Sequence, residues 1–313
     1  MSSADCIVIP PKKYVMHPRP NCPKQEIGRV EGAIRRLPSE IQAKRTLTMS
    51  KLLTIPAAEY HAASRRGEYV SSHLLADFRE SPELYRRKVS GEIEDADTPS
   101  LALGRATHCL VLEGRDAFDE QYVVADGPVN PRTGEPFGKA TKAYADWQAS
   151  QTKEVVGTKD FGFIVKLQKS VWLHDAASAL LNEGQAEGVV RADCCGVLCQ
   201  SRLDWLSNEY GIVDLKTCDS LKWFENDCRR YGYIYQMAFY RAAMREATGE
   251  TAPVRLIAVE KNEPFSTGVW ELTDDVLEQA ELVNEAALRR LRECRLKNEW
   301  PTGYEAIRIL DTL

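Results

Sequence analysis

The feature that most constrains the fold is a change from helical to alternating patterning at residue 185. Residues 185–193, 196–206 and 210–217 alternate apolar and polar side chains, as half-buried strands do. The connections are short, around Cys194-Cys195-Gly196 and across residues 207–211, which suits hairpins. We therefore predict three consecutive antiparallel strands in this stretch.

Helical patterns surround these strands. A short helix is expected to follow Ser71 or Ser72 as its cap, and another to start at Ser81-Pro82. Residues 126–138, rich in Gly and Pro, predict a long loop. The remaining expected elements are helices at 100–113, 139–151, 159–182, 221–248 and 274–298, and strands at 254–261 and 266–272. This order predicts a mixed α/β fold, with a largely antiparallel or mixed central sheet flanked by helices.

Charge is distributed unevenly along the 313 residues. Residues 1–51 hold ten Lys/Arg against four Asp/Glu, a net charge of +6, so the remainder carries −11 of the total of −5. We predict a basic, Pro-rich, flexible arm over 1–51, with contact to DNA or a partner as the alternative, and a single domain over 52–313. No run approaches the roughly 18 apolar residues of a membrane span, and no secretory signal is recognisable, so we expect a cytoplasmic protein without membrane contact.

The nine cysteines are odd in number and scattered. No C-x2-C pair occurs, although Cys194, Cys195 and Cys199 are close in sequence. A zinc or iron–sulfur centre and a disulfide framework are therefore disfavoured, and we expect most of these thiols to be small core residues.

The second and third predicted strands carry a D-x9-D-x-K pattern formed by Asp204, Asp214 and Lys216. Two carboxylates on adjacent strands can face one cleft and hold Mg²⁺ or Mn²⁺. A lysine on the same side can orient a water or stabilise charge on a phosphate, as phosphodiester hydrolysis requires. The alternative is a surface ion pair of little energetic value.

Further residues could complete this site. Glu187 on the first strand is a candidate acid, with Glu183 as its rival, and His108 could offer a ring nitrogen from the helix over 100–113. A histidine on an apolar helix is otherwise a core residue. Gln236 and Tyr240, four residues apart on the helix after Lys216, either contribute to the site or pack that helix.

Two arginines and two tryptophans near these motifs are further candidates for contact with DNA. Arg202 and Arg105 either clamp a 5′-phosphate or form solvated ion pairs. Trp205 and Trp223 are expected in the core rather than as base-stacking platforms.

Together these residues resemble the PD-(D/E)XK nuclease superfamily, with Asp204 as the first acid and Asp214-Leu215-Lys216 as (D/E)-x-K. Gly104-x3-His108 and Gln236-x3-Tyr240 resemble motifs of its RecB-type branch. Within that branch the nearest likeness is to RecE-type exodeoxyribonuclease VIII, whose amino-terminal signatures resemble three stretches here: residues 56–61, 71–72 and 103–108. Leu203 replaces the superfamily's proline, a structural position.

The resemblance implies a Mg²⁺-dependent exonuclease on ends of linear double-stranded DNA. Such enzymes degrade from the 5′ end, leave 3′ overhangs, form homo-oligomeric rings and act with a single-strand annealing protein in recombination. By position, His108, Asp204, Asp214 and the Leu215 carbonyl would bind metal, and Lys216 would be catalytic. Gln236 and Tyr240 would shape the site or touch substrate.

Three alternatives stay open. A PD-(D/E)XK endonuclease shares the same motifs. A catalytically inactive DNA-binding subunit would be expected to have lost an Asp or Lys, but all are present. A phosphodiesterase acting on another substrate shares the metal chemistry but not the order of motifs.

Overall fold

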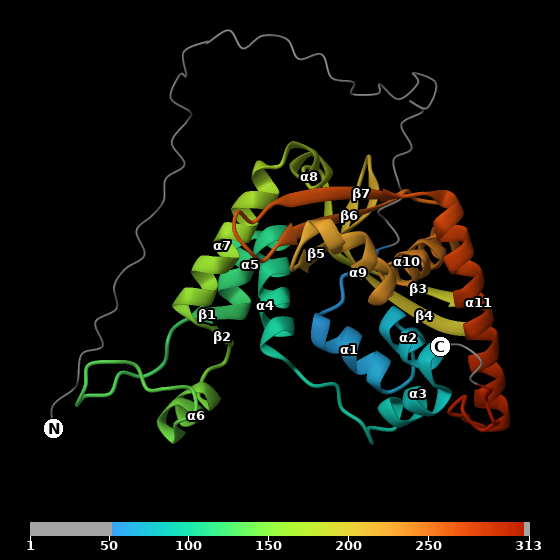
Figure 1. Cartoon of the computed structure of the whole chain (residues 1–313), viewed down its shortest axis with the longest axis horizontal. Helices are drawn as coiled ribbons and strands as arrows, with labels where there is room; N and C mark the ends of the chain where they lie inside the picture. The colour runs from blue at the N-terminus through green and yellow to red at the C-terminus, as the bar shows by residue number, and fades with distance from the viewer. Residues whose placement is uncertain (1–51, 310–313) are drawn as a thin grey trace, which may run out of the picture. The chain divides into compact units, whose positions relative to one another are not determined.

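The structure, a computed structural model, describes residues 52–309 of the chain (Figure 1). The helices are α1 (Ala57–Arg65), α2 (Ser72–Glu80), α3 (Pro82–Val89), α4 (Pro99–His108), η2 (Cys109–Glu113), α5 (Gly114–Gln121), α6 (Lys142–Ala149), α7 (Thr158–Leu173), α8 (Asp175–Leu180), η3 (Leu221–Trp223), α9 (Phe224–Arg230), α10 (Tyr233–Thr248) and α11 (Asp274–Lys297). The strands are β1 (Tyr122–Val124), β2 (Glu154–Val156), β3 (Gly184–Cys194), β4 (Val197–Ser207), β5 (Gly211–Cys218), β6 (Val254–Glu260) and β7 (Thr267–Leu272).

A five-stranded sheet in the order β3-β4-β5-β6-β7 forms the centre of the fold. The first three strands are antiparallel, as predicted, and β5 pairs in parallel with β6. The β3–β4 turn places Cys195 and Gly196 at φ of 58° and 78°, as a tight two-residue hairpin requires. The predicted mixed sheet flanked by helices is confirmed.

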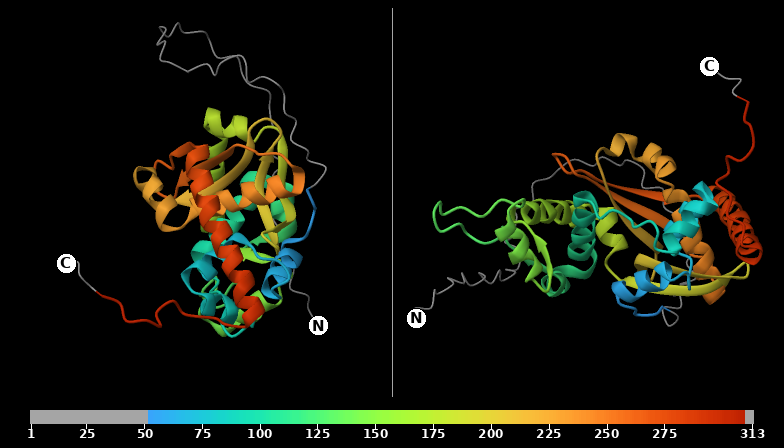
Figure 2. Two further views of the ribbon diagram at one scale, coloured as in Figure 1. Left: turned by 90° about the vertical axis from the view of Figure 1, so that its right-hand side faces the viewer. Right: turned by 90° about the horizontal axis from the view of Figure 1, so that it is seen from below.

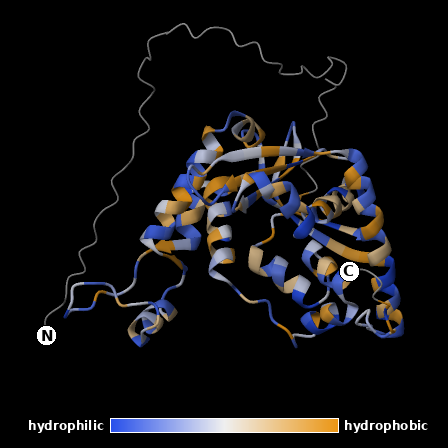
Figure 3. Ribbon diagram, viewed as in Figure 1, coloured by the Kyte–Doolittle hydropathy of each residue, from blue (hydrophilic) through white to orange (hydrophobic). Residues whose placement is uncertain are grey.

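Each face of the sheet is covered by a separate set of helices (Figures 1 and 2). One core cluster joins β4 and β6 residues such as Leu206 and Leu256 to α2, α10 and α11. The other joins β5 residues such as Val213 and Leu215 to α7 and α8. Hydrophobic and hydrophilic residues both colour α11 in Figure 3, as expected of a helix buried along one stripe.

The amino-terminal helices begin where their sequence signals lie. Ser71 Oγ accepts a hydrogen bond of 3.3 Å from the Leu74 amide at the start of α2, and Ser81 caps α3 in the same way. Pro82 occupies the first turn of α3, where its missing N–H has no intrahelical partner to lose. Both predicted helix starts are therefore confirmed, with Ser71 rather than Ser72 as the cap.

Two predicted helices are interrupted. The expected helix over 221–248 is divided into η3, α9 and α10, because Gly232 adopts the left-handed conformation with φ of 71°. The expected helix over 159–182 ends at Leu173, and His174 has an extended ψ of 114° before α8 begins. The helix over 100–113 finishes as a π-helical turn after His108.

Several short elements were not predicted. They are α1, α5 and the two three-residue strands β1 and β2, which pair in parallel. The predicted arm over 1–51 lies outside the described residues, and the single-domain assignment of 52–313 stays a prediction. Across residues 52–309, no helix is both long and apolar enough to span a membrane.

Candidate active site

The strands β4 and β5 separate at the predicted acids. Their ladder contains three residue pairs and ends at Trp205–Val213, one residue before Asp204 and Asp214. Beyond that point the Leu215 amide donates to Asp204 Oδ2 at 2.9 Å instead of to the β4 backbone. The fork therefore places a carboxylate where a strand would continue, and extending the register sets Asp204 opposite Asp214.

Asp204 is held by donors from two elements. Its Oδ2 lies 3.2 Å from His108 Nδ1 at the end of α4, besides accepting from Leu215. Burial opposes ionisation of Asp204, but the charge and hydrogen bond of His108 and the charge of Lys216 keep the pKa of this carboxyl below its usual value. These contacts favour the ionised form of Asp204. His108 therefore lies beside the predicted acid, and its role as a nitrogen ligand of the metal stays a prediction.

Asp214 is the most enclosed acid, with 1% of its side chain exposed. Neither of its carboxylate oxygens accepts a hydrogen bond. Lys216 Nζ lies 2.6 Å from Oδ2, close enough for an ion pair although not aligned as a hydrogen bond. Burial and the negative charge of Asp204 raise the pKa of Asp214 to about 6. Apart from this ammonium, no donor compensates the buried carboxylate, so its remaining oxygen could accept a metal ion.

Lys216 is oriented by the predicted Gln236 and Tyr240. Its Nζ donates to Gln236 Oε1 at 3.0 Å, and Gln236 Nε2 donates to the Tyr240 hydroxyl at 2.9 Å. Burial lowers the pKa of Lys216, but the charges of Asp214 and Asp204 raise it overall, so the ammonium stays charged. The four-residue spacing on α10 thus joins both side chains to the lysine.

Glu187 lies in the same cross-strand row as Asp204. The β3–β4 register pairs the residues on either side of them, so the two acids face each other across the ladder. Glu187 has a φ of 57°, a strained conformation for a residue with a side chain. Burial and Asp204 raise its pKa to about 7, and Arg202 forms an ion pair with it. The rival Glu183 precedes β3 and lines a different hollow.

If Glu187 helps to hold a cation, Glu187→Gln should raise the metal concentration needed for half-maximal DNA cleavage by about ten-fold. The reason is loss of one negative charge from the row of acids. Metal titrations of cleavage would measure it. Glu183→Gln is the matched control, and equal behaviour of the two variants would remove Glu187 from the site.

Two of the candidate DNA-contacting or core residues, Arg105 and Trp223, lie away from the acids and away from the core, respectively. Arg105 lies outside the group, where its guanidinium contacts Asp97 at 2.8 Å and Glu154 at 3.1 Å. Trp223 was expected in the core but is 56% exposed, because it ends the short η3 turn at the surface. The core placement of Trp205 agrees with its packing against the α7–α8 side of the sheet.

One contact of the lysine was not predicted. Lys216 Nζ lies 4.7 Å from the centre of the Tyr233 ring, at the first position of α10. The only sequence signal is position: Tyr233 precedes Gln236 by three residues, so both share a helical face.

The donors present suit a hard divalent cation. Asp204 and Asp214 supply carboxylate oxygens on two strands, and Asp214, whose Oδ2 is ion-paired with Lys216, keeps Oδ1 free for coordination. Among residues 52–309, no three His, Cys, Asp or Glu side chains converge as a ready-made metal site. A cation here would therefore need the Leu215 carbonyl or water beside the two aspartates.

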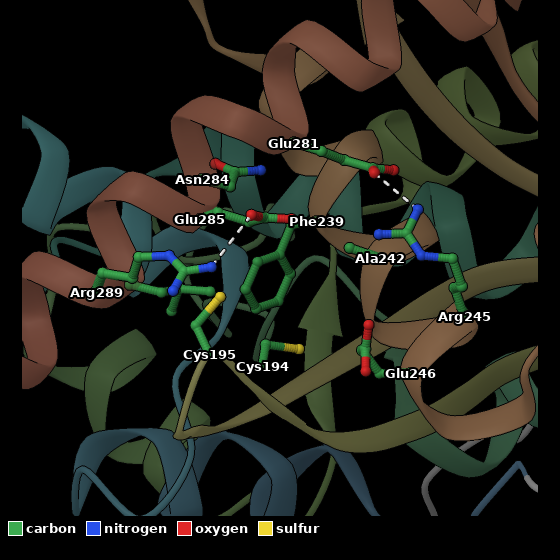
Figure 4. Close-up of a pocket in the computed structure, with 11 residues that line it drawn as sticks. Cys194, Cys195, Phe239, Ala242, Arg245, Glu246, Glu281, Asn284, Glu285 and Arg289 are labelled. Atoms are coloured by element: carbon green, nitrogen blue, oxygen red, sulfur yellow. Dashed lines mark hydrogen bonds and ion pairs between the residues drawn. The ribbon is translucent and has the colours of Figure 1, made fainter.

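A hollow of about 290 Å³ opens away from these acids, between the β3–β4 turn and helices α10 and α11 (Figure 4). Cys194, Cys195 and Phe239 line it, and none of the predicted site residues does. Of the cysteines in the described range, all but Cys195 are buried, as core thiols are.

Comparison with known proteins agrees with this geometry. Residues 71–312 match the family model of the PDDEXK-like domain of unknown function (DUF3799). The chain belongs to this family. Its place in the PD-(D/E)XK superfamily is thereby confirmed, and nucleases of this class generally use divalent metals. None of the curated proteins matches the chain.

A solved structure shares the fold. It is a crystal structure of a protein from Eubacterium rectale described as a "Putative exonuclease". The alignment has a TM-score of 0.60 and 18% identity, and covers 83% of this chain and 96% of that one. At this identity the similarity establishes the common fold.

Proposed function

We propose that this protein is a metal-dependent DNA exonuclease. It hydrolyses phosphodiester bonds of linear double-stranded DNA from 5′ to 3′ and leaves 3′ single-stranded overhangs for recombination. The observation that carries the nuclease proposal is the forked pair of strands that sets Asp204 opposite Asp214, with Lys216 Nζ 2.6 Å from the unsatisfied Asp214 carboxylate.

The residues divide the chemistry among them. Asp204, Asp214 and the Leu215 carbonyl would hold a Mg²⁺ or Mn²⁺ ion, whose Lewis acidity would stabilise the phosphate charge. Lys216, held charged by Asp214 and aimed by Gln236, orients the attacking water and stabilises negative charge on the phosphate oxygens. Tyr240 fixes Gln236 through its hydroxyl. His108 keeps Asp204 oriented at the fork.

The exonuclease polarity, the ring and the annealing partner rest on the motif likeness to RecE-type enzymes. The description of the Eubacterium rectale protein as a "Putative exonuclease" supports the same class. The proposed substrate is the end of a DNA duplex, and no membrane partner is proposed.

The test is digestion of linear duplex DNA labelled at the 5′ or 3′ end of one strand. Reactions contain Mg²⁺, Mn²⁺ or EDTA, with closed circular plasmid alongside. Early release of the 5′ label from linear DNA, with metal and not with EDTA, is expected. Equal cutting of the plasmid would instead identify an endonuclease, and DNA binding without cutting would identify an inactive binding subunit.

Lys216→Ala should lower the rate of this cleavage by about 100- to 1,000-fold, because it removes an ammonium that would stabilise the negative charge developing on the phosphate. Single-turnover cleavage at saturating metal measures the effect. Lys166→Ala, which removes an exposed lysine on α7, is the control and should cleave normally. A Lys216→Ala protein that keeps the wild-type rate would contradict the assigned role.

A further inference from the structure

A line of aromatic rings leads from the catalytic lysine to the protein surface. Tyr233 lies under Lys216 Nζ, and the Tyr231 ring follows it with a centroid separation of 5.8 Å and an interplanar angle of 33°. Tyr231 is 57% exposed. The left-handed Gly232 between them makes the bend that sets the two rings side by side.

The outer end of this line carries positive charge. The Arg230 guanidinium lies 5.3 Å from the Tyr231 ring centre at the end of α9. At the start of α9, Lys222 Nζ lies 5.1 Å from the exposed Trp223 ring. In the part of the chain that the structure describes, these two cations lie over rings rather than in ion pairs with carboxylates. The acids of α9, Glu225 and Asp227, sit in its first turn, so the arginines gather at the end beside Tyr231.

The helix α9, which links these exposed rings, is packed against the protein core. Phe224, the first residue of α9, is fully buried. Its ring packs 4.6 Å from that of Trp270 and 6.4 Å from that of Tyr233. Exposed flat rings with neighbouring cations on a fixed support are how proteins hold unpaired bases and their phosphates. In a duplex the base faces are already stacked on one another and are unavailable to such rings.

We propose that Tyr231, Trp223, Lys222 and Arg230 form a stacking platform for a single-stranded stretch of DNA beside the catalytic centre (Figure 1, α9). The inference rests on the proposed function and names the strand form that the site handles. Unpaired nucleotides next to the scissile bond lie on Tyr231, and Arg230 contacts their phosphates.

The experiment measures binding of a short 5′-fluorescent oligothymidylate by anisotropy, using the full chain in EDTA so that no cleavage occurs. Tyr231→Ala should raise the Kd by about five- to 100-fold, the range for loss of one base–aromatic stack. Tyr231→Phe keeps the ring and should bind close to wild type. Tyr304→Ala is the matched control, because Tyr304 is 70% exposed and also carries an arginine, Arg308, over its ring at 4.2 Å.

Each outcome decides the proposal. Selective loss of binding in Tyr231→Ala supports the platform. Wild-type binding by Tyr231→Ala, equal losses in Tyr231→Ala and Tyr304→Ala, or no binding by the wild type would overturn it. Cleavage of end-labelled duplex by the wild type is scored separately. Binding through Tyr231 without any cleavage would reject the nuclease and keep the platform, whereas cleavage with unaltered Tyr231→Ala binding would reject the platform alone.

Discussion

Replacing Asp214 with asparagine should stop DNA cleavage while making the metal-free protein more stable. The activity loss follows from removal of a proposed metal-binding carboxylate and should reach about 1,000-fold, since a bound cation is worth several kcal/mol in such reactions. The gain in stability follows from the same residue, because its carboxylate is buried beside the negative charge of Asp204 and is compensated only by the Lys216 ammonium.

Ionisation of Asp214 should destabilise the folded protein as the pH rises. The pKa of Asp214 is raised from 3.8 to about 6 by burial and by Asp204, so folding favours its neutral form. Its contribution to stability is complete below pH 3.8 and is lost as the pH rises through 6. At pH 7 and above the ionised group costs up to about 3 kcal/mol, and loss of the Lys216 ion pair offsets part of the gain on replacement. We therefore expect a net gain of about 1–2 kcal/mol for Asp214→Asn.

Thermal unfolding in EDTA from pH 4 to pH 8 tests this. The Tm difference between Asp214→Asn and wild type should be near zero at pH 4 and largest above pH 7. Excess Mg²⁺ should then stabilise the wild type more than the variant. Asp146→Asn, at an exposed position on α6, is the control. A variant less stable than the wild type at pH 8 in EDTA would show that the carboxylate is well accommodated without metal.

The largest loss of stability is expected for Arg241→Ala. Arg241 is 2% exposed at the interface of α10 and α11, where its Nε donates to Glu281 at 2.6 Å and its Nη1 to Asp274 at 2.7 Å. Glu281 is itself buried and keeps Arg245 as its other partner, at 2.8 Å. Removing Arg241 leaves a buried carboxylate half compensated, which should cost about 3–5 kcal/mol.

Urea denaturation followed by circular dichroism measures this effect as a fall in the transition midpoint. Arg289→Ala is the matched control on α11, because that arginine is 67% exposed and 3.7 Å from Glu285. Its replacement should change stability by less than about 1 kcal/mol. The double variant Arg241→Met/Glu281→Leu removes both buried charges and should recover most of the loss. Equal midpoints for Arg241→Ala and Arg289→Ala would contradict the assignment.

The relative placement of Asp214 and Lys216 could be predicted from the sequence, because strand alternation is a local property. Alternate residues of a strand share a face, so the spacing already places Asp214 and Lys216 on one face of β5, and the hairpin spacing brings Asp204 beside them. The spacing of Gln236 and Tyr240 works in the same way on a helix. These patterns do not depend on how distant segments pack.

The missed features depend on tertiary packing or on single backbone angles. The break at Gly232 is one left-handed residue within an otherwise helical pattern. The strands β1 and β2 have three residues each, too few for a period to be visible. The partners of Arg105, Asp97 and Glu154, come from segments that only the fold brings together. Likewise, the exposure of Trp223 is set by where η3 meets solvent, not by hydrophobicity.

The three-pair ladder between β4 and β5 also has a mechanical consequence. Asp204 belongs to a long hairpin and Asp214 to a parallel pair of strands, and direct strand pairing between these two bodies ends just before the acids. Backbone hydrogen bonds between β4 and β5 therefore do not fix the distance between the two carboxylates. A cation bound by both of them would join the two strands beyond the end of the ladder. Slower hydrogen–deuterium exchange at the Leu215 amide on adding metal is the expected mark of that link.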